Sequence, residues 1–183
     1  MRRSARRLSW GLSWAFTAFM AALPLLAVVY FWNLEWMLAR KDVMNMLPAG
    51  VLQVLPLLGP VTLKTKLICL AAVAAPTALT CVLLRRLALL FNGYARGEVF
   101  TLQSVRYIRQ VGVLLLVREA LEPFSGAVLA LGLTVNNPPG HHMVTLGLSG
   151  SDLTQIVTGL ALIVAAGVMD QGRRLHEDAL LTI

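Results

Sequence analysis

Four stretches of the chain consist almost entirely of apolar residues. They comprise residues 10–32, 67–84, 111–134 and 153–169. Three of them contain no charged side chain, and the third along the chain is interrupted by Arg118, Glu119 and Glu122. A helix needs about 20 mostly apolar residues to cross the hydrocarbon core of a bilayer. The pattern therefore predicts an all-α fold, an integral membrane bundle of four transmembrane helices that form one domain over residues 1–183.

The N-terminus begins as a secretory signal peptide does, with arginines ahead of an apolar stretch. A signal h-region runs for about 7–15 residues, whereas this stretch continues from Trp10 to Trp32 and ends in an aromatic cluster. No small-x-small cleavage site precedes a polar start of a mature chain. We therefore interpret the stretch as an uncleaved first transmembrane helix, with cleavage as the alternative.

Basic residues are divided unevenly between the two sides of the predicted bundle. One side has Arg2, Arg3, Arg6, Arg7, Arg85, Arg86, Arg96, Arg106, Arg109, Arg173 and Arg174, and the other has Arg40, Lys41, Lys64 and Lys66. Lys and Arg favour the cytoplasmic loops of membrane proteins. We therefore expect a multi-pass protein of a bacterial cytoplasmic (inner) membrane, with both termini in the cytoplasm. Interfacial anchors bracket the first helix, namely Trp10, Trp14, Trp32 and Trp36.

The composition supports a membrane protein and argues against a soluble enzyme. Hydrophobic residues make up 57% of the 183 residues and charged residues 14%, against about 45–50% and about 25% in soluble domains. A net charge of +7 would suit nucleic-acid binding, but so little polar surface does not. We expect the lipid bilayer as a partner, no direct contact with nucleic acid and no cofactor.

The most patterned polar stretch, residues 90–109, lies between the second and third predicted helices. Two glycines favour a turn there, and Thr101 is a suitable N-cap for a helix that runs into the third span. The arginines of this amphipathic segment would contact either lipid phosphates or a cytosolic protein. The candidate contact residues are Arg96, Gly97, Phe100, Thr101, Arg106 and Arg109.

The C-terminal tail leaves the last span through Gly-Arg-Arg-Leu, adds two acidic residues and ends in Leu-Thr-Ile. Together with the segment Gly97-Glu98-Val99-Phe100-Thr101 and the basic residues after it, this tail resembles a bacterial family of small four-span membrane proteins, domain of unknown function 2975. The sequence departs from the family at Ala179 and Leu180, where acidic or polar residues are more usual. The candidate tail residues are Gly172, Arg173, Arg174, Glu177, Asp178 and Thr182.

The resemblance implies a regulatory role and carries over no catalytic residue. Members of that family often lie beside short helix-turn-helix regulators. The first function hypothesis is therefore a non-enzymatic sensor or regulatory protein with a cytosolic partner, such as a small helix-turn-helix regulator. The chain also has no Gly-rich phosphate loop, metalloprotease helix motif or nucleophile elbow, so we expect no enzymatic activity.

The charged residues of the third span form an intramembrane polar cluster of Arg118, Glu119 and Glu122. Ionisable groups in a span are costly, so they face the bundle interior and pair with one another. The three share one helix face, and Arg118 and Glu122 have the i,i+4 spacing of an ion pair. One interpretation is structural pairing. The alternative function is a proton- or ion-coupled transporter or channel component, which would also require a homo-oligomer.

The outer side offers weaker candidates for chemistry. His141 and His142 lie near several methionines, and imidazoles with thioethers can bind copper(I). Adjacent histidines do not share one face of a helix, so we favour a solvated turn and predict no metal site. Cys69 and Cys81 would be about 18 Å apart on one helix, which predicts apolar packing and no disulfide. The apolar loop Met44–Leu63 either packs on the outer end of the bundle or re-enters the membrane.

Overall fold

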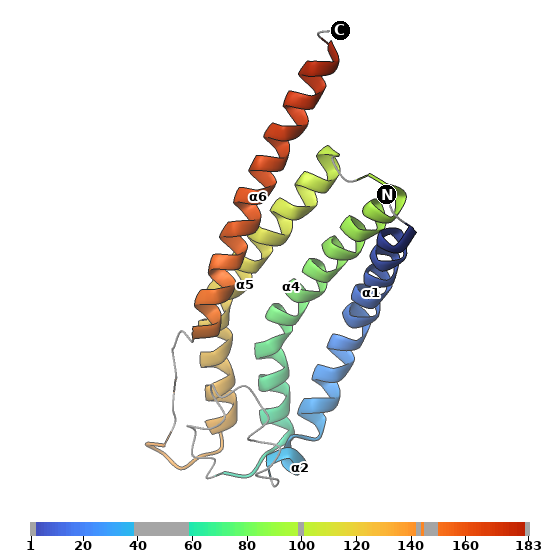
Figure 1. The fold of residues 1–183 in the computed structure, drawn as a ribbon. Coiled ribbons are helices and arrows are strands. Elements are labelled where there is room, and N and C mark those ends of the chain that lie inside the picture. The colour runs from blue at the N-terminus through green and yellow to red at the C-terminus, as the bar shows by residue number, and fades with distance from the viewer. Residues whose placement is uncertain (1–2, 39–58, 99–100, 142–143, 145–149, 182–183) are drawn as a thin grey trace. The chain divides into compact units, whose positions relative to one another are not determined.

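The computed structural model describes residues 3–38, 59–98, 101–141, 144 and 150–181, with side chains described at 6–36, 59–98, 101–141, 144 and 152–175. Within these ranges the chain forms α-helices and no strand (Figure 1). The helices are α1 (Arg3–Trp32), α2 (Leu34–Leu38), α4 (Leu63–Arg96), α5 (Leu102–Thr134) and α6 (Gly150–Leu181). The all-α prediction is confirmed, and each predicted span lies inside one of the four long helices.

Among the described residues, three segments are long and apolar enough to cross a membrane: Arg6–Trp32, Leu63–Arg96 and Asp152–Leu175. They lie in α1, α4 and α6, and they indicate a membrane protein. The apolar part of α5 differs from them because Arg118, Glu119 and Glu122 interrupt it. The prediction of a helical membrane protein therefore holds, with three clear spans among the described residues where the sequence predicted four.

The surface of α1 carries large apolar side chains along the length of the helix. Phe19, Leu25 and Val29 are all more than half exposed. Soluble proteins rarely expose contiguous apolar patches larger than a few hundred Å², whereas lipid chains solvate such side chains. The exposed face of α1 is thus what a helix in contact with lipid requires.

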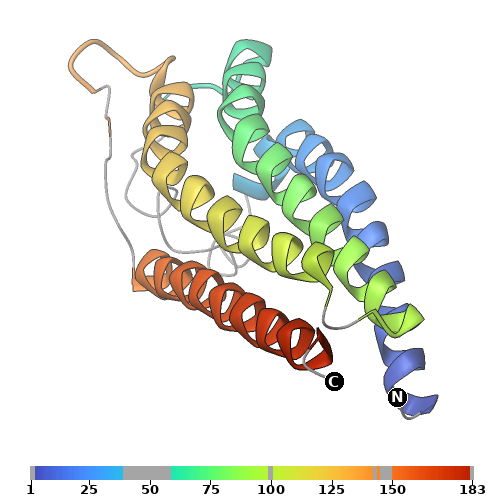
Figure 2. The same ribbon diagram turned by 90° about the horizontal axis from the view of Figure 1, so that it is seen from above.

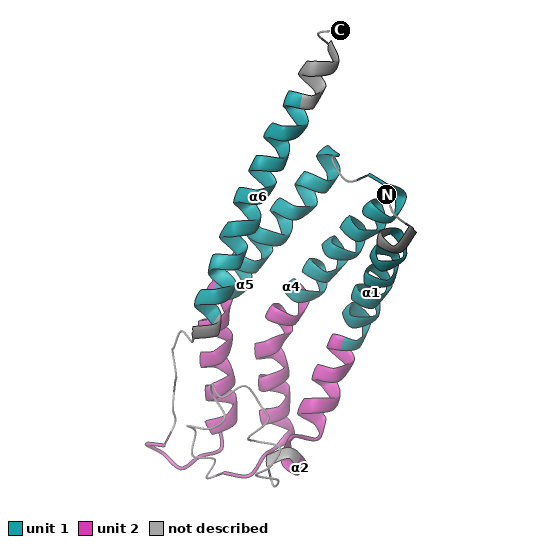
Figure 3. Cartoon of the chain, in the orientation of Figure 1, with its two compact units in different colours: residues 1–22, 79–119, 151–183 teal, residues 23–78, 120–150 magenta. Residues whose placement is uncertain are grey.

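The chain divides into two compact units, and α1, α4 and α5 each contribute residues to both (Figure 3). Unit 1 comprises Met1–Ala22, Leu79–Glu119 and Ser151–Ile183. Within it, the Ser13 hydroxyl of α1 donates to the Ala88 carbonyl of α4 at 3.0 Å. The rings of Phe16 and Phe91 also stack 5.6 Å apart. These contacts fasten α1 against α4 in this unit (Figure 2).

A pair of glycines brings α5 and α6 into close contact in unit 1. A Cβ added to Gly112 would lie 2.7 Å from the Gly159 carbonyl oxygen and 2.8 Å from Cγ1 of Ile163. Small residues at such positions let transmembrane helices approach closely, and van der Waals packing then drives their association. The close approach of α5 and α6 therefore depends on the missing side chains at this crossing.

Unit 2 comprises Leu23–Ala78 and Ala120–Gly150 and has a small apolar core. The buried residues of this core are Phe31, Leu34, Cys69 and Leu133. Gly132 of α5 lies against Ile68 of α4, where an added Cβ would be 2.8 Å from Cγ2. Both cysteines are free, and Cys69 is fully buried in this core. The prediction of packing cysteines without a disulfide is confirmed.

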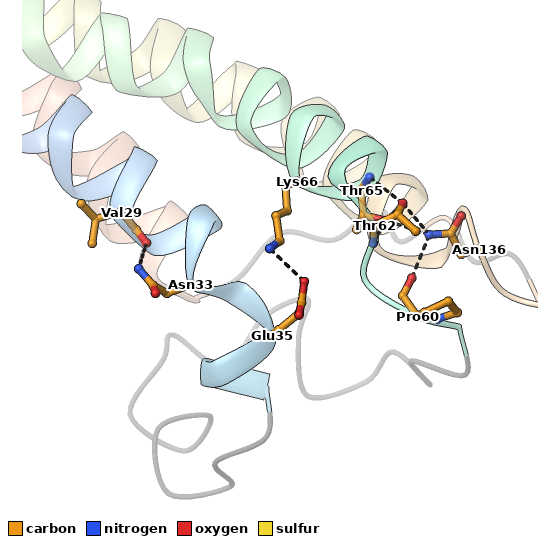
Figure 4. Close-up of polar contacts among 8 residues, drawn as sticks. All are labelled: Val29, Asn33, Glu35, Pro60, Thr62, Thr65, Lys66 and Asn136. Carbon is orange, nitrogen blue, oxygen red and sulfur yellow. Dashed lines mark hydrogen bonds and ion pairs between the residues drawn. The ribbon is translucent and has the colours of Figure 1, made fainter.

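Asn136 holds the segment before α4 against the end of α5 in unit 2 (Figure 4). Its side-chain amide donates to the Pro60 carbonyl at 2.8 Å and lies 3.0 Å from the hydroxyls of Thr62 and Thr65. Residues 59–63 of the outer loop are therefore packed, whereas residues 44–58 lie outside the described part of the chain. Between α2 and α4, Glu35 and Lys66 form an ion pair at 2.8 Å.

Gly112→Ala should destabilise the protein, because the new methyl group must displace the Gly159 backbone or Ile163. Overpacking of this kind costs about 1–3 kcal/mol. We expect a correspondingly lower melting temperature in mild detergent, measured by far-UV circular dichroism.

Gly167→Ala is the matched control, since no described atom lies within 4 Å of a Cβ added there. It should leave the melting temperature unchanged or raise it slightly, because Ala favours helix over Gly by about 0.5–1 kcal/mol. Equal melting temperatures for the two variants would contradict close packing at Gly112.

Candidate functional site

The turn that leaves α4 is closed by backbone hydrogen bonds around Gly97. Gly97 has φ +91°, a left-handed conformation that favours glycine. Its N–H donates to the Tyr94 carbonyl at 3.0 Å, and the Glu98 N–H donates to the Gly93 carbonyl at 3.0 Å. This is the Schellman pattern of a helix C-terminus. The predicted turn is confirmed.

Thr101 caps the beginning of α5, as its residue type predicts. Its Oγ1 accepts a hydrogen bond from the Ser104 N–H at 3.2 Å, which satisfies one of the free donors at a helix start. The buried Ser104 hydroxyl donates to the Glu98 carbonyl at 2.9 Å. The first turn of α5 is thereby tied back to the end of the α4 turn. Phe100, also a predicted contact residue, lies outside the described residues.

A cavity of about 120 Å³ lies beside this turn. Its lining includes Asn92, Gly93 and Arg96 from the end of α4, and Ser104 and Tyr107 from the start of α5. Arg96 and Glu98 form an ion pair at 3.5 Å at its edge, with both side chains at least half exposed. Exposed pairs of this kind contribute little to stability, so the Arg96 guanidinium is accessible to other anions.

Arg106 and Arg109 lie on the first two turns of α5, and both are exposed. Arg96 is also exposed, so the three predicted basic contact residues of residues 90–109 are accessible on structured elements. Gly97 and Thr101 shape the turn between them and do not add charge. The predicted turn at the end of α4 and the predicted N-cap of α5 therefore agree with the structure.

A second cavity, about 350 Å³ in volume, lies between the beginning of α1 and the end of α4. Arg6, Arg7 and Trp10 of α1 line it, together with Asn92, Ala95 and Arg96 of α4. The sequence indicated the role of Arg6 and Arg7 in orientation but did not place them beside Arg96. The two groups are more than eighty residues apart, and only the packing of α1 on α4 brings them together. We call this cavity the basic groove.

The predicted tail residues belong to a continuous helix. Within α6, Asp170 binds Arg173 at 3.1 Å and Arg174 at 3.0 Å through its two carboxylate oxygens. The tail arginines are thus held by an acidic neighbour, while Gly172 is exposed. Glu177 and Asp178 lie in α6, but their side chains are outside the described part, as is Thr182.

The intramembrane polar cluster is arranged differently from the prediction. The Arg118 guanidinium donates to Oε1 of Glu119 at 3.1 Å, and the side chains are 27% and 2% exposed. The structure thus pairs Arg118 with its sequence neighbour and corrects the i,i+4 pairing with Glu122. Rotamers allow the adjacent carboxylate to reach the guanidinium, which spacing alone does not reveal. Nε of Arg118 is buried and has no hydrogen-bond partner among the described residues.

His141 belongs to no metal centre in the described part of the chain. His141 is exposed, and its backbone carbonyl accepts a hydrogen bond from the Asn137 amide at 3.1 Å. His142 lies outside the described residues. Among the residues that the structure describes, no group of three His, Cys, Asp or Glu side chains is placed to hold a metal ion.

Residues 55–183 match the family model described as Protein of unknown function (DUF2975). The chain belongs to this family. The resemblance predicted from the α4–α5 turn and the tail is therefore confirmed. The DUF2975 match includes α4, α5 and α6 and with them both sides of the turn, whereas Arg6, Arg7 and Trp10 precede it. No curated protein and no solved structure matches the chain.

Glu119→Gln should strongly destabilise this DUF2975 protein, because it leaves the partly buried Arg118 without its counter-charge. Removing one member of a buried ion pair costs about 3–5 kcal/mol. We expect a clearly lower free energy of unfolding, measured by denaturant titration in mild detergent.

The double variant Arg118→Met/Glu119→Gln tests the reason for this loss. Because it removes both charges, it should recover most of the stability that Glu119→Gln loses. A double variant as unstable as the single one would show that Glu119 acts through other contacts and not through Arg118.

Proposed function

We propose that this protein is a non-enzymatic sensor or regulator of a bacterial inner membrane that presents a basic surface to a cytosolic protein. The observation that carries the proposal is the hydrogen-bonded turn at Gly97 together with the Thr101 cap of α5, beside which Arg96, Arg106 and Arg109 are exposed. A preformed backbone loses less conformational entropy on binding than a flexible loop does. Charge complementarity calls for an acidic surface on the partner.

A fourth transmembrane helix is part of this proposal. Two close contacts of α5 support it. In its first third α5 packs through Gly112 on α6, and near its end it packs through Gly132 on α4. Both partner helices contain candidate spans. The two contacts are about 30 Å apart along the helix, which is close to the thickness of a hydrocarbon core, so we assign α5 as the remaining span.

The distribution of basic residues supports a cytoplasmic position for the α4–α5 turn and for both termini. With four spans, the two termini lie on the same side. The described basic residues assigned to that side belong to unit 1, and Lys64 and Lys66, which are assigned to the outside, belong to unit 2. The positive-inside rule then favours a cytoplasmic position for the end of α4 and the beginning of α5.

Purification in mild detergent from the native host tests the partner directly. We expect one cytosolic protein to co-purify in stoichiometric amount and to bind again when both purified components are mixed. Arg106→Gln/Arg109→Gln should weaken this binding about ten-fold or more, since each charge-assisted contact contributes about 1.5–3 kcal/mol.

Arg6→Gln/Arg7→Gln is the matched control, because it removes the same charge from the same predicted side but not from α5. It should leave the binding constant within about two-fold of the wild type. Equal losses in both double variants would indicate general electrostatic attraction and contradict a docking surface on α5. The absence of any cytosolic partner would also contradict the proposal.

Proton- or ion-coupled transport is the second candidate, and the buried Arg118–Glu119 pair favours it. Charged groups inside spans often mark proton or ion pathways. If this candidate is correct, proteoliposomes with a pH-sensitive dye inside should show flux under a membrane potential, and Glu122→Gln or Glu119→Gln should abolish it. Flux that both variants retain would exclude a relay through these carboxylates.

A further inference from the structure

The basic groove brings three guanidinium groups around an apolar floor. Arg6 and Arg7 come from the first described turns of α1, and Arg96 comes from the last turn of α4. Trp10 and Ala95 supply apolar surface between them. All of these residues belong to unit 1, and the contacts between α1 and α4 described above hold the two sides of the groove together.

The tryptophans of α1 place the groove at the level of lipid headgroups. Trp14 and Trp32 are about 27 Å apart along a helix that rises 1.5 Å per residue, close to the thickness of about 30 Å of a hydrocarbon core. Tryptophans favour the two membrane interfaces, and Trp10 is 61% exposed. Arg6 and Arg7 lie about 5 Å beyond Trp10 along α1, which is the depth of the lipid phosphates.

Few negatively charged groups neutralise the arginines of the groove. Among the described residues, neither Arg6 nor Arg7 forms an ion pair, and both are exposed. Arg96 has the carboxylate of Glu98 at 3.5 Å, in a half-exposed pair that another anion can displace. A guanidinium presents parallel N–H donors that match the oxygens of a phosphate. The Asn92 amide adds a neutral donor to the lining.

We propose that the basic groove binds the phosphate of an anionic phospholipid headgroup, with Arg6, Arg7 and Arg96 on the phosphate and Trp10 against the glycerol and the upper acyl chains. Basic pockets between transmembrane helices on the cytoplasmic side bind anionic headgroups in this way. The apolar floor favours a lipid over free phosphate, which has no apolar part to cover it. This inference depends on α1 crossing the bilayer and does not depend on a cytosolic partner.

Fluorescence quenching of Trp10 tests the site in the full-length protein. Trp14, Trp32 and Trp36 are replaced by Phe, and the protein is reconstituted in phosphatidylcholine vesicles with a minor fraction of phosphatidylglycerol. The bromine atoms that quench the fluorescence are placed in the acyl chains near the headgroup, either of phosphatidylglycerol or of phosphatidylcholine. We expect brominated phosphatidylglycerol to quench Trp10 with an apparent affinity at least about five-fold higher than that of brominated phosphatidylcholine.

Three variants distinguish a specific lipid site in the basic groove from general electrostatic attraction of anionic lipid to the basic surface. The affinity ratio is the apparent affinity for brominated phosphatidylglycerol divided by that for brominated phosphatidylcholine. Arg6→Gln/Arg7→Gln should lower this ratio to about one, because the phosphate loses two of its three guanidinium contacts. Arg106→Gln/Arg109→Gln removes the same charge outside the groove and should preserve the ratio. Asn92→Leu leaves the net charge unchanged and should lower the ratio part of the way. Circular dichroism verifies that each variant remains helical.

Three results would overturn the proposal. The first is equal quenching by the two brominated lipids in the wild-type groove. The second is an equal fall of the ratio in both arginine double variants, which would show attraction to the whole basic surface. The third is a fall of the affinity ratio to about one when inorganic phosphate is added to the buffer, but not when chloride is added at the same concentration. That result would identify free phosphate as the ligand.

Discussion

Lipid hydrocarbon provides no hydrogen-bond partner for a peptide group, and the structure follows from this constraint. Each backbone N–H and C=O inside the bilayer has to be satisfied within its own helix or by a neighbour. The helices α1, α4 and α6, which contain the candidate spans of the described residues, achieve this along their apolar lengths. The polar side-chain networks of the described residues accordingly concentrate near helix ends, where Asn136 and Ser104 bind backbone carbonyls.

The helix α5 combines the two demands that conflict most in a membrane. It packs closely on its neighbours through Gly112 and Gly132, and it also carries the ion pair of Arg118 and Glu119. Small residues favour tight helix contacts in lipid, whereas an ionised group needs a partner nearby because burial in a low-dielectric medium is costly. Both requirements are met by contacts of α5 within the two units, with α6 at Gly112 and with α4 at Gly132.

The end of α4 connects the two proposed binding properties. Asn92 and Arg96 line both the cavity beside the α4–α5 turn and the basic groove. A phosphate bound in the groove would compete with Glu98 for Arg96 and so change the charge presented beside the turn. Because the Schellman motif at Gly97 holds the backbone in place, such a change would act through electrostatics and would not require the turn to refold.

The sequence alone determined the helices, the Thr101 cap and the family. These follow from local properties: long apolar stretches form helices in lipid, a threonine oxygen satisfies a nearby N–H, and short segments carry the resemblance. It did not determine that Arg118 binds Glu119 and not Glu122, because side-chain rotamers and neighbouring helices select between them. The crossing at Gly112 and the basic groove are also tertiary features. Each joins residues far apart in the chain, and such contacts depend on how helices pack, which no local pattern of apolar and polar residues specifies.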